Sequence, residues 1–281
     1  NLSWEKFSKI NNQLYDLNGV KPVVSISRNY PYKENYTHII GYVSQANEKD
    51  IMLNKIVKER FVQGLKVGKI GLERSFEDIL IGDNSIERYE VNAYGRRISQ
   101  LAFKNGNKGK TIKLTIDTEI QKACGELLNE KAGSISVMDI YTGDIIAMYS
   151  SPSYNPNLFL FGISQDEWQL IRNNPLKPLI NKTLSGLYSP GSTIKPIVAL
   201  SALENNIIGP NFKVKCTGKT ELYGQTFHCK KEKGHGVMSL KNAMKQSCDT
   251  YFYEISRLLG VDRLKITAEK FGLGEKVLGT Y

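Results

Sequence analysis

Residues 189–196 of this 281-residue chain read SPGSTIKP and open the apolar run 197–203, and no other segment restricts its own local structure as strongly. Proline and glycine interrupt the chain just before Ser192, so Ser192 is expected at the N-terminus of the helix that follows. Lys195 comes three residues later and would lie one turn away on the same helix face. Pro196 fits this position because the first helical turn does not use the N–H that proline lacks.

A serine and a lysine in this arrangement are suited to nucleophilic catalysis. A serine hydroxyl is a weak nucleophile unless a base lies within hydrogen-bond reach, and a lysine whose ammonium form is disfavoured by desolvation can be that base. The helix N-terminus would also favour negative charge on the serine oxygen. The alternative is an N-cap serine beside a solvated lysine, because short S-x-x-K patterns often occur by chance. Ser192 and Lys195 are therefore candidates for a catalytic pair.

A second motif supports the catalytic interpretation. Ser247 lies fifty-five residues after Ser192 and, with Cys248 and Asp249, opens the helical run 250–259. On these motifs the chain resembles the penicillin-binding transpeptidases, which carry S-x-x-K, S-x-N and K-T-G around one cleft. Among them it is most similar to the elongation-type class B proteins, the penicillin-binding protein 2 group. The similarity also covers the segments 28–32, 37–43, 68–73, 92–96, 114–117, 142–148 and 152–157.

The resemblance implies an α+β fold with two domains. Residues 1–110 would form a non-catalytic pedestal domain of the dimerisation type, and residues 111–281 would form the first part of a transpeptidase domain with the serine β-lactamase-like fold. The polar segment 104–110 independently favours a boundary at this point because it has no apolar period. The sequence contains no K-T-G or K-S-G triplet, so the span is expected to end before the third motif.

The resemblance also implies a reaction. Ser192 would attack the carbonyl between the two terminal D-alanines of a peptidoglycan stem peptide, and the amine of a neighbouring strand would resolve the acyl-enzyme. Lys195 would be the base, Ser247 would relay a proton to the leaving amine, and Asp249 would hold the substrate or orient Lys195. β-Lactams would acylate Ser192 stably. A β-lactam sensor or β-lactamase of the same fold, and a catalytically silent scaffold of the elongation machinery, are alternatives.

Expectations about partners and location rest on the resemblance alone. The partners would be peptidoglycan stem peptides, β-lactam antibiotics, a membrane glycosyltransferase and other proteins of the cell-elongation complex. A membrane helix before Asn1 would anchor both domains on the periplasmic side of the bacterial inner membrane. No organic cofactor is expected.

Three cysteines and a histidine form a second candidate site. Cys216, Cys229, His235 and Cys248 follow the pattern C-x12-C-x5-H-x12-C and make a complete tetrahedral ligand set for a structural Zn²⁺. The spacing is looser than in a zinc finger, so a disulfide between Cys216 and Cys229, or buried thiols, is the alternative. His228 could replace Cys229 or His235 as a ligand. The resemblance also implies a metal here, and a metal bond through Cys248 would fix the surrounding Ser-x-Asp motif.

The net charge of +10 raises the question of nucleic-acid binding. Residues 213–245 contain eight lysines and two glutamates. These lysines are not accompanied by a run of interleaved aromatic residues and no nucleic-acid motif is present, so nucleic acid is not expected as a partner. The lysines are better explained as a solvated face that stabilises a negatively charged thiolate site.

Periodicity and turn signals predict the other elements. His38 is expected to be a structural histidine with satisfied hydrogen bonds, and Cys124 is expected in the core. Helices are predicted at 4–15, 50–63, 75–80, 117–129 and 165–172, strands at 20–27 and 112–116, and a hairpin at 133–149.

Overall fold

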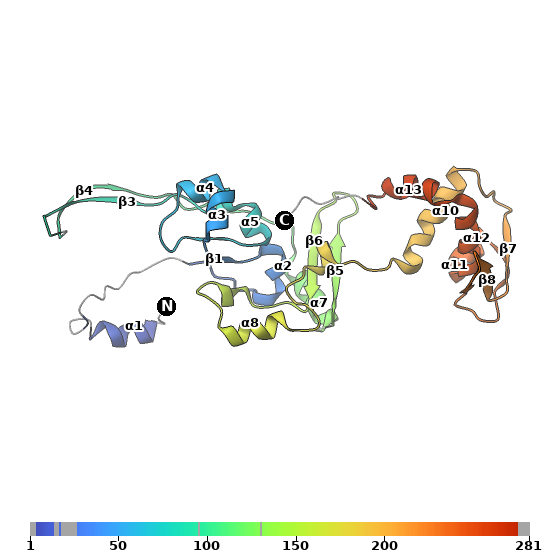
Figure 1. The fold of residues 1–281 in the computed structure, drawn as a ribbon, viewed down its shortest axis with the longest axis horizontal. Coiled ribbons are helices and arrows are strands. Elements are labelled where there is room, and N and C mark those ends of the chain that lie inside the picture. Colours follow the sequence, from blue (N-terminus) through green and yellow to red (C-terminus); the bar gives the residue numbers. More distant parts are fainter. Residues whose placement is uncertain (1–3, 14–16, 18–26, 95, 130, 275–281) are drawn as a thin grey trace. The chain divides into compact units, whose positions relative to one another are not determined.

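The structure is a computed structural model that describes residues 4–13, 17, 27–94, 96–129 and 131–274. Its contacts divide the chain into two compact units, residues 1–186 and residues 187–280 (Figure 1). Both units combine helices with short antiparallel strands, so the predicted α+β class is confirmed. Among the helices of these described residues, none is both long and apolar enough to cross a membrane.

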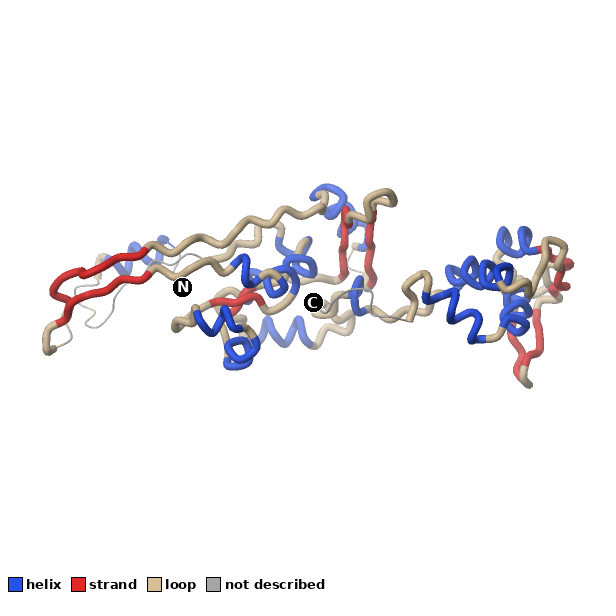
Figure 2. Tube along the Cα trace, turned by 90° about the horizontal axis from the view of Figure 1, so that it is seen from above, coloured by secondary structure: helices blue, strands red, loops and turns tan. Residues whose placement is uncertain are grey.

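Short helices and two-stranded sheets make up the first unit. Its helical segments are α1 (Trp4–Asn11), η2 (Lys33–Asn35), α2 (Thr37–Ile40), α3 (Glu48–Leu53), α4 (Lys55–Glu59), α5 (Gly71–Ser75), α6 (Glu77–Leu80), α7 (Thr118–Leu128), η3 (Pro156–Phe159), α8 (Gln165–Arg172) and α9 (Lys182–Ser185). Its strands pair antiparallel: β1 (Val43–Gln45) with β2 (Lys66–Gly68), β3 (Ile86–Val91) with β4 (Arg97–Lys104), and β5 (Gly133–Met138) with β6 (Ile145–Ser151). Figure 2 shows β3 and β4 as an extended hairpin, and nearly all of its described side chains are exposed.

The second unit carries both candidate sites. Its helical segments are η4 (Gly191–Ile194), α10 (Lys195–Glu204), α11 (Leu240–Gln246), α12 (Asp249–Leu259) and α13 (Val261–Glu269). Its strands are β7 (Lys213–Cys216), which pairs with β10 (Gly236–Ser239), and β8 (Lys219–Leu222), which pairs with β9 (Gln225–His228). Both pairs are antiparallel.

Elements with strong local signals form as predicted. Helix α8 has the predicted bounds, and Ser164 caps it by accepting a hydrogen bond from the backbone N–H of Glu167. Helix α7 begins after Asp117, whose carboxylate accepts hydrogen bonds from two N–H groups of the first turn. The predicted hairpin is the β5–β6 pair. These elements depend on short-range capping and alternation, which the sequence displays directly.

Other predictions were wrong in part. The helix predicted at 50–63 is divided into α3 and α4 at Asn54, because the Asn54 side chain accepts the N–H groups of Ile56 and Val57 and starts a new helix. The helix predicted at 75–80 is likewise divided between α5 and α6. Residues 112–116 form no strand, since no neighbouring strand pairs with them in the described part. Most of the predicted strand at 20–27 and the end of the helix predicted at 4–15 lie outside the described residues.

Hydrogen bonds tie the segments before and after residue 110 together inside the first unit. The Asn157 side chain accepts the Tyr30 N–H at 3.1 Å and donates to the Tyr30 carbonyl at 2.9 Å. Gln121 Nε2 donates to the Asn35 carbonyl at 2.7 Å. Such bonds explain why the contact-based division falls after residue 186, although the sequence predicts a domain boundary at 110.

Two buried residues of the first unit test the expectations about the core. Cys124 is 3 % exposed, which confirms its predicted packing role. His38 is also buried, but its Nε2 has no hydrogen-bond partner among the described residues, so the expected satisfaction of its hydrogen bonds was wrong for this atom. Burial, followed by the nearby Lys182 charge, lowers the pKa of His38 to about 4. The buried ring instead packs edge-on against Tyr154, with centroids 5.7 Å apart.

The core of the second unit lies around α10 and α12. Ala202 and Tyr251 are fully buried there, and the three cysteines of the candidate metal site belong to the same cluster. A polar link joins α10 to α13, because Thr267 donates to the Ser201 hydroxyl at 2.9 Å. This packing holds the N-terminus of α10 beside the start of α12, where the two candidate catalytic motifs lie.

Candidate active site and metal cluster

Ser192 and Lys195 lie at the junction of η4 and α10. Gly191, with φ of 55°, supplies the left-handed conformation that the turn before Ser192 requires. Ser192 is exposed, whereas Lys195 is the first residue of α10 and only 8 % exposed. Pro196 follows within the first turn, as predicted. The junction therefore presents a solvent-accessible hydroxyl beside a buried amine.

Ser247 lies at the turn between α11 and α12 in a conformation that serine rarely adopts. Its φ of 51° and ψ of 48° are left-handed, which costs a non-glycine residue about 1–2 kcal/mol. The turn is held by backbone bonds, including the one from the Cys248 N–H to the Ala243 carbonyl at 2.9 Å. Strained backbone of this kind is concentrated at functional sites, and here it orients the Ser247 hydroxyl towards Ser192 and Lys195.

The four predicted catalytic residues form one hydrogen-bonded chain. Ser247 Oγ donates to Ser192 Oγ at 2.9 Å, and Lys195 Nζ donates to Ser247 Oγ at 3.0 Å. Lys195 Nζ also donates to the Ser247 carbonyl at 3.0 Å and to Asp249 Oδ1 at 2.6 Å. Within this described site, Lys195 makes no direct hydrogen bond with Ser192, so the Ser247 hydroxyl is the bridge between them.

Asp249 is held from two sides. Its Oδ1 accepts from Lys195, and its Oδ2 accepts the backbone N–H of Lys230 at 2.9 Å. Burial favours a raised pKa for the Asp249 carboxyl, but the hydrogen bonds from Lys195 and Lys230 and the Lys195 charge outweigh it and keep that pKa below its ordinary value. The side chain is thus a fixed carboxylate that sets the position of the Lys195 amine.

The predicted metal ligands come together in one cluster. Cys216 ends β7, Cys248 precedes α12, and Cys229 and His235 lie in the loop between β9 and β10. One ligand atom from each of the four residues lies within 4.8 Å of the other three, and the three cysteines are buried. All four cysteines of the chain are free thiols, so the alternative disulfide between Cys216 and Cys229 does not form. His228 is not a member of this cluster.

The cluster has dimensions that suit tetrahedral zinc. Zn–S and Zn–N bonds of ordinary length put a thiolate sulfur and an imidazole nitrogen about 3.6 Å apart. His235 Nδ1 lies 3.6 Å from Cys216 Sγ and 3.4 Å from Cys229 Sγ. The donor atoms present therefore fit a closed structural zinc site with three sulfurs and one nitrogen.

Two glycines let the ligand loop close. Gly218 and Gly234 have φ of 97° and 76°, and a Cβ on Gly218 would lie 1.8 Å from the Glu232 carbonyl oxygen. The Cys229 N–H donates to the Gly218 carbonyl at 2.9 Å. Side chains at these two positions would separate the segment that carries Cys216 from the segment that leads to His235.

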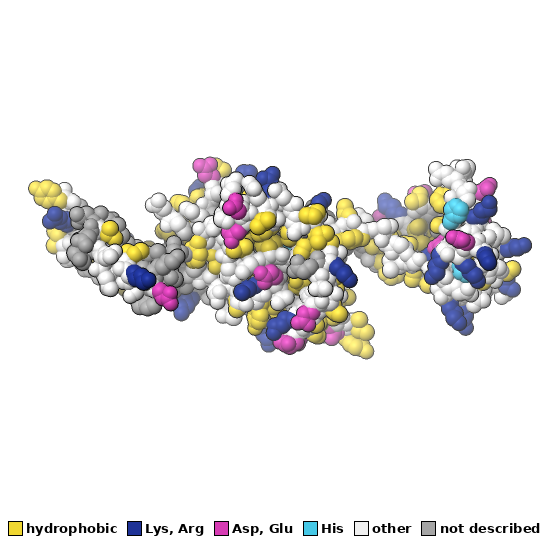
Figure 3. Space-filling view, turned by 90° about the horizontal axis from the view of Figure 1, so that it is seen from below, with side chains coloured by type: hydrophobic (Ala, Val, Ile, Leu, Met, Phe, Trp, Pro, Cys, Tyr) yellow, Lys and Arg dark blue, Asp and Glu magenta, His cyan; other side chains and the backbone are white. Residues whose placement is uncertain are grey.

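The thiols differ in acidity. Burial opposes ionisation of Cys216, but its hydrogen bonds with Thr250, whose Oγ1 lies 3.4 Å from Cys216 Sγ, and with His235 lower its pKa to about 6. Burial, with the neighbouring thiols, raises the pKa of Cys248 to about 12. A bound cation would reverse this second effect, because a metal-bound thiol is deprotonated. Figure 3 shows several dark-blue lysine and arginine side chains, together with a few magenta acidic ones, near the histidines on the visible face of this unit.

Some contributors to the site were not predicted from the sequence. The Lys230 N–H on Asp249 and the Thr250 hydroxyl beside Cys216 both act on motif residues, and the Phe252 ring lies 5.4 Å from Lys195 Nζ. Their positions next to Cys229 and Asp249 in the chain are the only sequence signal for them. Every residue except proline has a backbone N–H, so the residue type at position 230 could not have predicted that Lys230 would bind Asp249.

Comparison with protein families shows to which family the chain belongs. Residues 133–280 match the family described as "Penicillin binding protein transpeptidase domain". The chain belongs to this family. Residues 1–114 match the family described as "Penicillin-binding Protein dimerisation domain", so this penicillin-binding protein combines a dimerisation, or pedestal, domain with the start of a transpeptidase domain, as the motifs predicted.

Curated relatives and solved structures agree with this assignment. "Peptidoglycan D,D-transpeptidase MrdA" of Acinetobacter baumannii is 34 % identical over 98 % of this chain and 41 % of that protein. The Escherichia coli protein of the same name is 39 % identical over 88 % of this chain and 40 % of that protein. The chain thus spans about two fifths of the length of these relatives.

Solved structures of penicillin-binding protein 2 have the same fold. The Helicobacter pylori protein, in complex with MreC, matches with a TM-score of 0.84 and 30 % identity over 98 % of this chain and 50 % of the solved chain. The Pseudomonas aeruginosa protein, in complex with WCK 5153, matches with a TM-score of 0.74 and 35 % identity over 92 % of this chain and 53 % of the solved chain. The predicted similarity to the penicillin-binding protein 2 group is confirmed.

Proposed function

We propose that the protein is a peptidoglycan D,D-transpeptidase that cross-links stem peptides through a Ser192 acyl-enzyme and is covalently inhibited by β-lactams. The observation that carries the proposal is the hydrogen-bonded chain from Ser192 through Ser247 to Lys195 and Asp249. A nucleophile, a bridging hydroxyl and a buried amine in one chain are the parts that acyl transfer requires. The names of the curated relatives support the same reaction.

Each residue has a step in this proposal. For the attack the two hydroxyls rotate, so that Ser192 donates to Ser247 Oγ and Ser247 donates to the uncharged Lys195 amine. Ser192 Oγ then attacks the carbonyl carbon of the terminal D-alanyl-D-alanine bond while its proton passes by way of the Ser247 hydroxyl to Lys195, the general base. The C–N bond then breaks, and Ser247 returns a proton to the nitrogen of the departing D-alanine. The amine of a second stem peptide next attacks the ester carbonyl, which restores the Ser192 hydroxyl and forms the cross-link. Asp249 keeps the Lys195 amine in place throughout.

We also propose that Cys216, Cys229, His235 and Cys248 hold a structural Zn²⁺. The sulfur-to-nitrogen distances and the burial of the cluster support this identity over a metal of octahedral oxygen preference. When bound, the ion supplies a cross-link and no chemistry of its own. Cys248 separates Ser247 from Asp249, so the four ligands would restrain the turn that orients the Ser247 hydroxyl.

Partners and location follow from the proposed reaction. We propose peptidoglycan stem peptides as substrate, a membrane glycosyltransferase and elongation-complex proteins as partners, and the periplasmic side of the inner membrane as the site of action. The complex of a similar protein with MreC, and a similar structure described as part of a peptidoglycan synthase complex, support the partners. A domain boundary at residues 110–111 belongs to the same proposal.

A labelling experiment tests the proposed function. The full-length protein is treated with a penicillin and its intact mass is measured, with Ser192→Ala as the test variant and Ser189→Ala as the matched control, because Ser189 is exposed in the segment just before the motif. One adduct per chain is expected in the unsubstituted protein and in Ser189→Ala, and none in Ser192→Ala. A folded, zinc-loaded protein without an adduct would favour the silent-scaffold alternative.

A further inference from the structure

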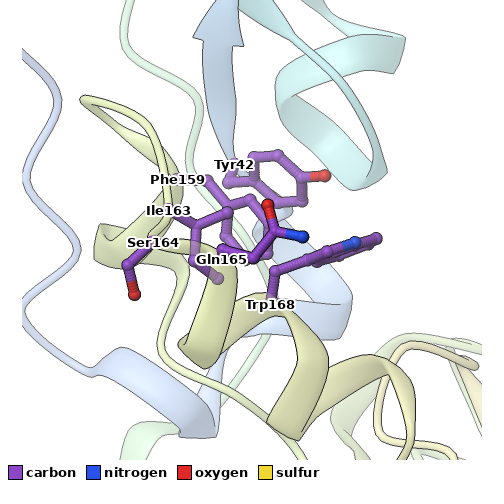
Figure 4. Close-up of a pocket in the computed structure, with 6 residues that line it drawn as sticks. All are labelled: Tyr42, Phe159, Ile163, Ser164, Gln165 and Trp168. Carbon is purple, nitrogen blue, oxygen red and sulfur yellow. The ribbon is translucent and has the colours of Figure 1, made fainter.

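An open aromatic pocket in the first unit has no role in the proposed reaction. It has a cavity volume of about 330 Å³ and is lined by Tyr42, Phe159, Ile163, Ser164, Gln165 and Trp168 (Figure 4). This volume lies near the lower end of the range for small-ligand sites, roughly 300–1,000 Å³, and suits a ligand the size of one ring. The lining residues come from the position just before β1 and from the stretch that runs from the end of η3 into α8, and all belong to one compact unit.

The aromatic rings of the pocket are fixed against one another. Tyr42 and Phe159 stack with centroids 4.2 Å apart, and Phe159 meets Trp168 edge-on at 6.2 Å. Phe159 is buried, whereas Tyr42 and Trp168 are half-buried and keep part of their surface open to solvent. The walls therefore offer pre-formed aromatic faces, whose negative π-surface attracts weakly polarised C–H groups.

Polar groups without partners face the same space. Within the described residues, the Tyr42 hydroxyl, the Gln165 amide and the Trp168 indole N–H form no hydrogen bond. Figure 4 shows the Gln165 amide between the Tyr42 ring and the Trp168 indole. The Ser164 hydroxyl, in contrast, is bonded to Glu167 and points away. A ligand in this pocket would meet three groups with unused hydrogen-bonding capacity.

The chemistry of the lining selects the ligand. None of the six lining residues carries a charge, which disfavours a phosphate, a carboxylate or an ammonium group. An apolar side chain of a partner protein would fill the space but would remove water from three polar groups without replacing their hydrogen bonds. A pyranose ring has an apolar C–H face and a hydroxylated edge, and an acetamido group matches the paired donor and acceptor of Gln165.

We propose that the pocket binds a neutral N-acetylated pyranose ring. The ring would lie against Tyr42 or Trp168 and place its acetamido group on the Gln165 amide. The assignment of its source to the glycan strands of peptidoglycan rests on the proposed function, whereas the ring chemistry rests on the pocket alone. The site would hold the glycan at a place distinct from the serine that reacts with the stem peptide.

Tryptophan fluorescence tests this proposal. The 281-residue chain has two tryptophans, so the emission of Trp168 is obtained in the full-length protein as the difference between Trp4→Phe and the double variant Trp4→Phe, Trp168→Phe. Ser192→Ala is added so that acyl transfer plays no part in the measurement. The probes are the tetramer of N-acetylglucosamine, glycan strands from peptidoglycan freed of their stem peptides, and cellotetraose, which has the same ring without the acetamido group.

A saturable change in Trp168 emission is expected with the first two probes and not with cellotetraose. Gln165→Ala and Tyr42→Phe are expected to raise the dissociation constant about tenfold, as for one lost hydrogen bond of ordinary strength. Gln169→Ala is the matched control, because it makes the same change on an exposed residue of α8 that does not line the pocket, and it is expected to leave binding unchanged.

Several outcomes would overturn the proposal. They are the absence of a saturable change with the tetramer in folded protein, equal binding of cellotetraose, and equal effects of Gln165→Ala and Gln169→Ala. Binding of the tetramer without binding of the stripped glycan strands would overturn the assignment to peptidoglycan. Penicillin labelling of the protein with Ser192 intact is a separate measurement, so failure of the proposed function and failure of this site are distinguishable.

Discussion

Removal of the Ser247 hydroxyl is expected to slow acylation by a β-lactam about 10²–10³-fold. The hydroxyl accepts a bond from the Lys195 amine at 3.0 Å and donates one to Ser192 at 2.9 Å. A hydrogen bond to a charged group contributes about 1.5–3 kcal/mol and a neutral one about 1 kcal/mol. Their sum, about 2.5–4 kcal/mol, converts to that loss at about 1.36 kcal/mol per tenfold change in rate.

The assay is the second-order rate of labelling by a fluorescent penicillin, with thermal unfolding measured on the same samples. Two variants separate chemistry from backbone strain, because Ser247 has a left-handed backbone that alanine tolerates poorly and glycine adopts freely. Ser247→Ala and Ser247→Gly are expected to lose labelling by the same factor, although their stabilities differ. Ser239→Ala removes a hydroxyl from the other end of α11 and is expected to label at the normal rate.

Two results would refute the reasoning. If both Ser247 variants label within about threefold of the unsubstituted protein, the proton does not pass through this hydroxyl and Lys195 acts on Ser192 directly. If the alanine variant is slow and the glycine variant is normal, the loss comes from the shape of the turn and the hydroxyl is dispensable.

Three other predictions concern the metal cluster and the first unit. Cys229→Ser is expected to lower bound zinc from about one ion per chain to a small fraction, whereas Cys124→Ser, which changes a buried cysteine outside the cluster, retains it, as metal analysis of purified protein would show. Burial lowers the pKa of His38 to about 4 from an ordinary 6.5. Between these two pH values the unfolded chain binds a proton at His38 and the folded chain does not. About 3 kcal/mol of the free energy of unfolding present above pH 6.5 should therefore be lost as the pH falls to 4. His38→Gln should flatten that part of the pH dependence of the free energy of unfolding. Asn157→Ala removes both side-chain bonds to the Tyr30 backbone and should lower the free energy of unfolding by about 2–3 kcal/mol in urea titrations.

Each of these predictions has a contradicting outcome. Equal zinc contents in the Cys229→Ser and Cys124→Ser variants would mean that the cluster does not hold the zinc. A pH dependence unaffected by His38→Gln would mean that other groups titrate in that range. For Asn157→Ala, the control is Asn173→Ala at the exposed end of α8, and equal small losses in the two variants would show that the bonds to Tyr30 contribute little.

The predictable part of the fold consists of elements that depend on near neighbours in the chain. Helix α8 and the β5–β6 hairpin formed as predicted because a capping box and a short turn between two apolar runs act over a few residues. The interruption at Asn54 and the missing strand at 112–116 were not predicted. In the first case a side chain competes for the helical N–H groups, and in the second a strand requires a partner that a one-dimensional pattern does not reveal.

The sequence by itself determined the residue types of both candidate sites, because the proposed acyl transfer needs a serine near a base and the proposed zinc needs soft ligands in sufficient number. It also determined the family, since the motifs occur in a fixed order along the chain. Tertiary structure alone decided that Ser247 bridges Ser192 and Lys195, that a backbone N–H holds Asp249, and that Tyr42 stacks on Phe159 beside a pocket. The physical reason is distance: these contacts join segments far apart in the chain, so only the packed fold can bring them within hydrogen-bonding or van der Waals reach.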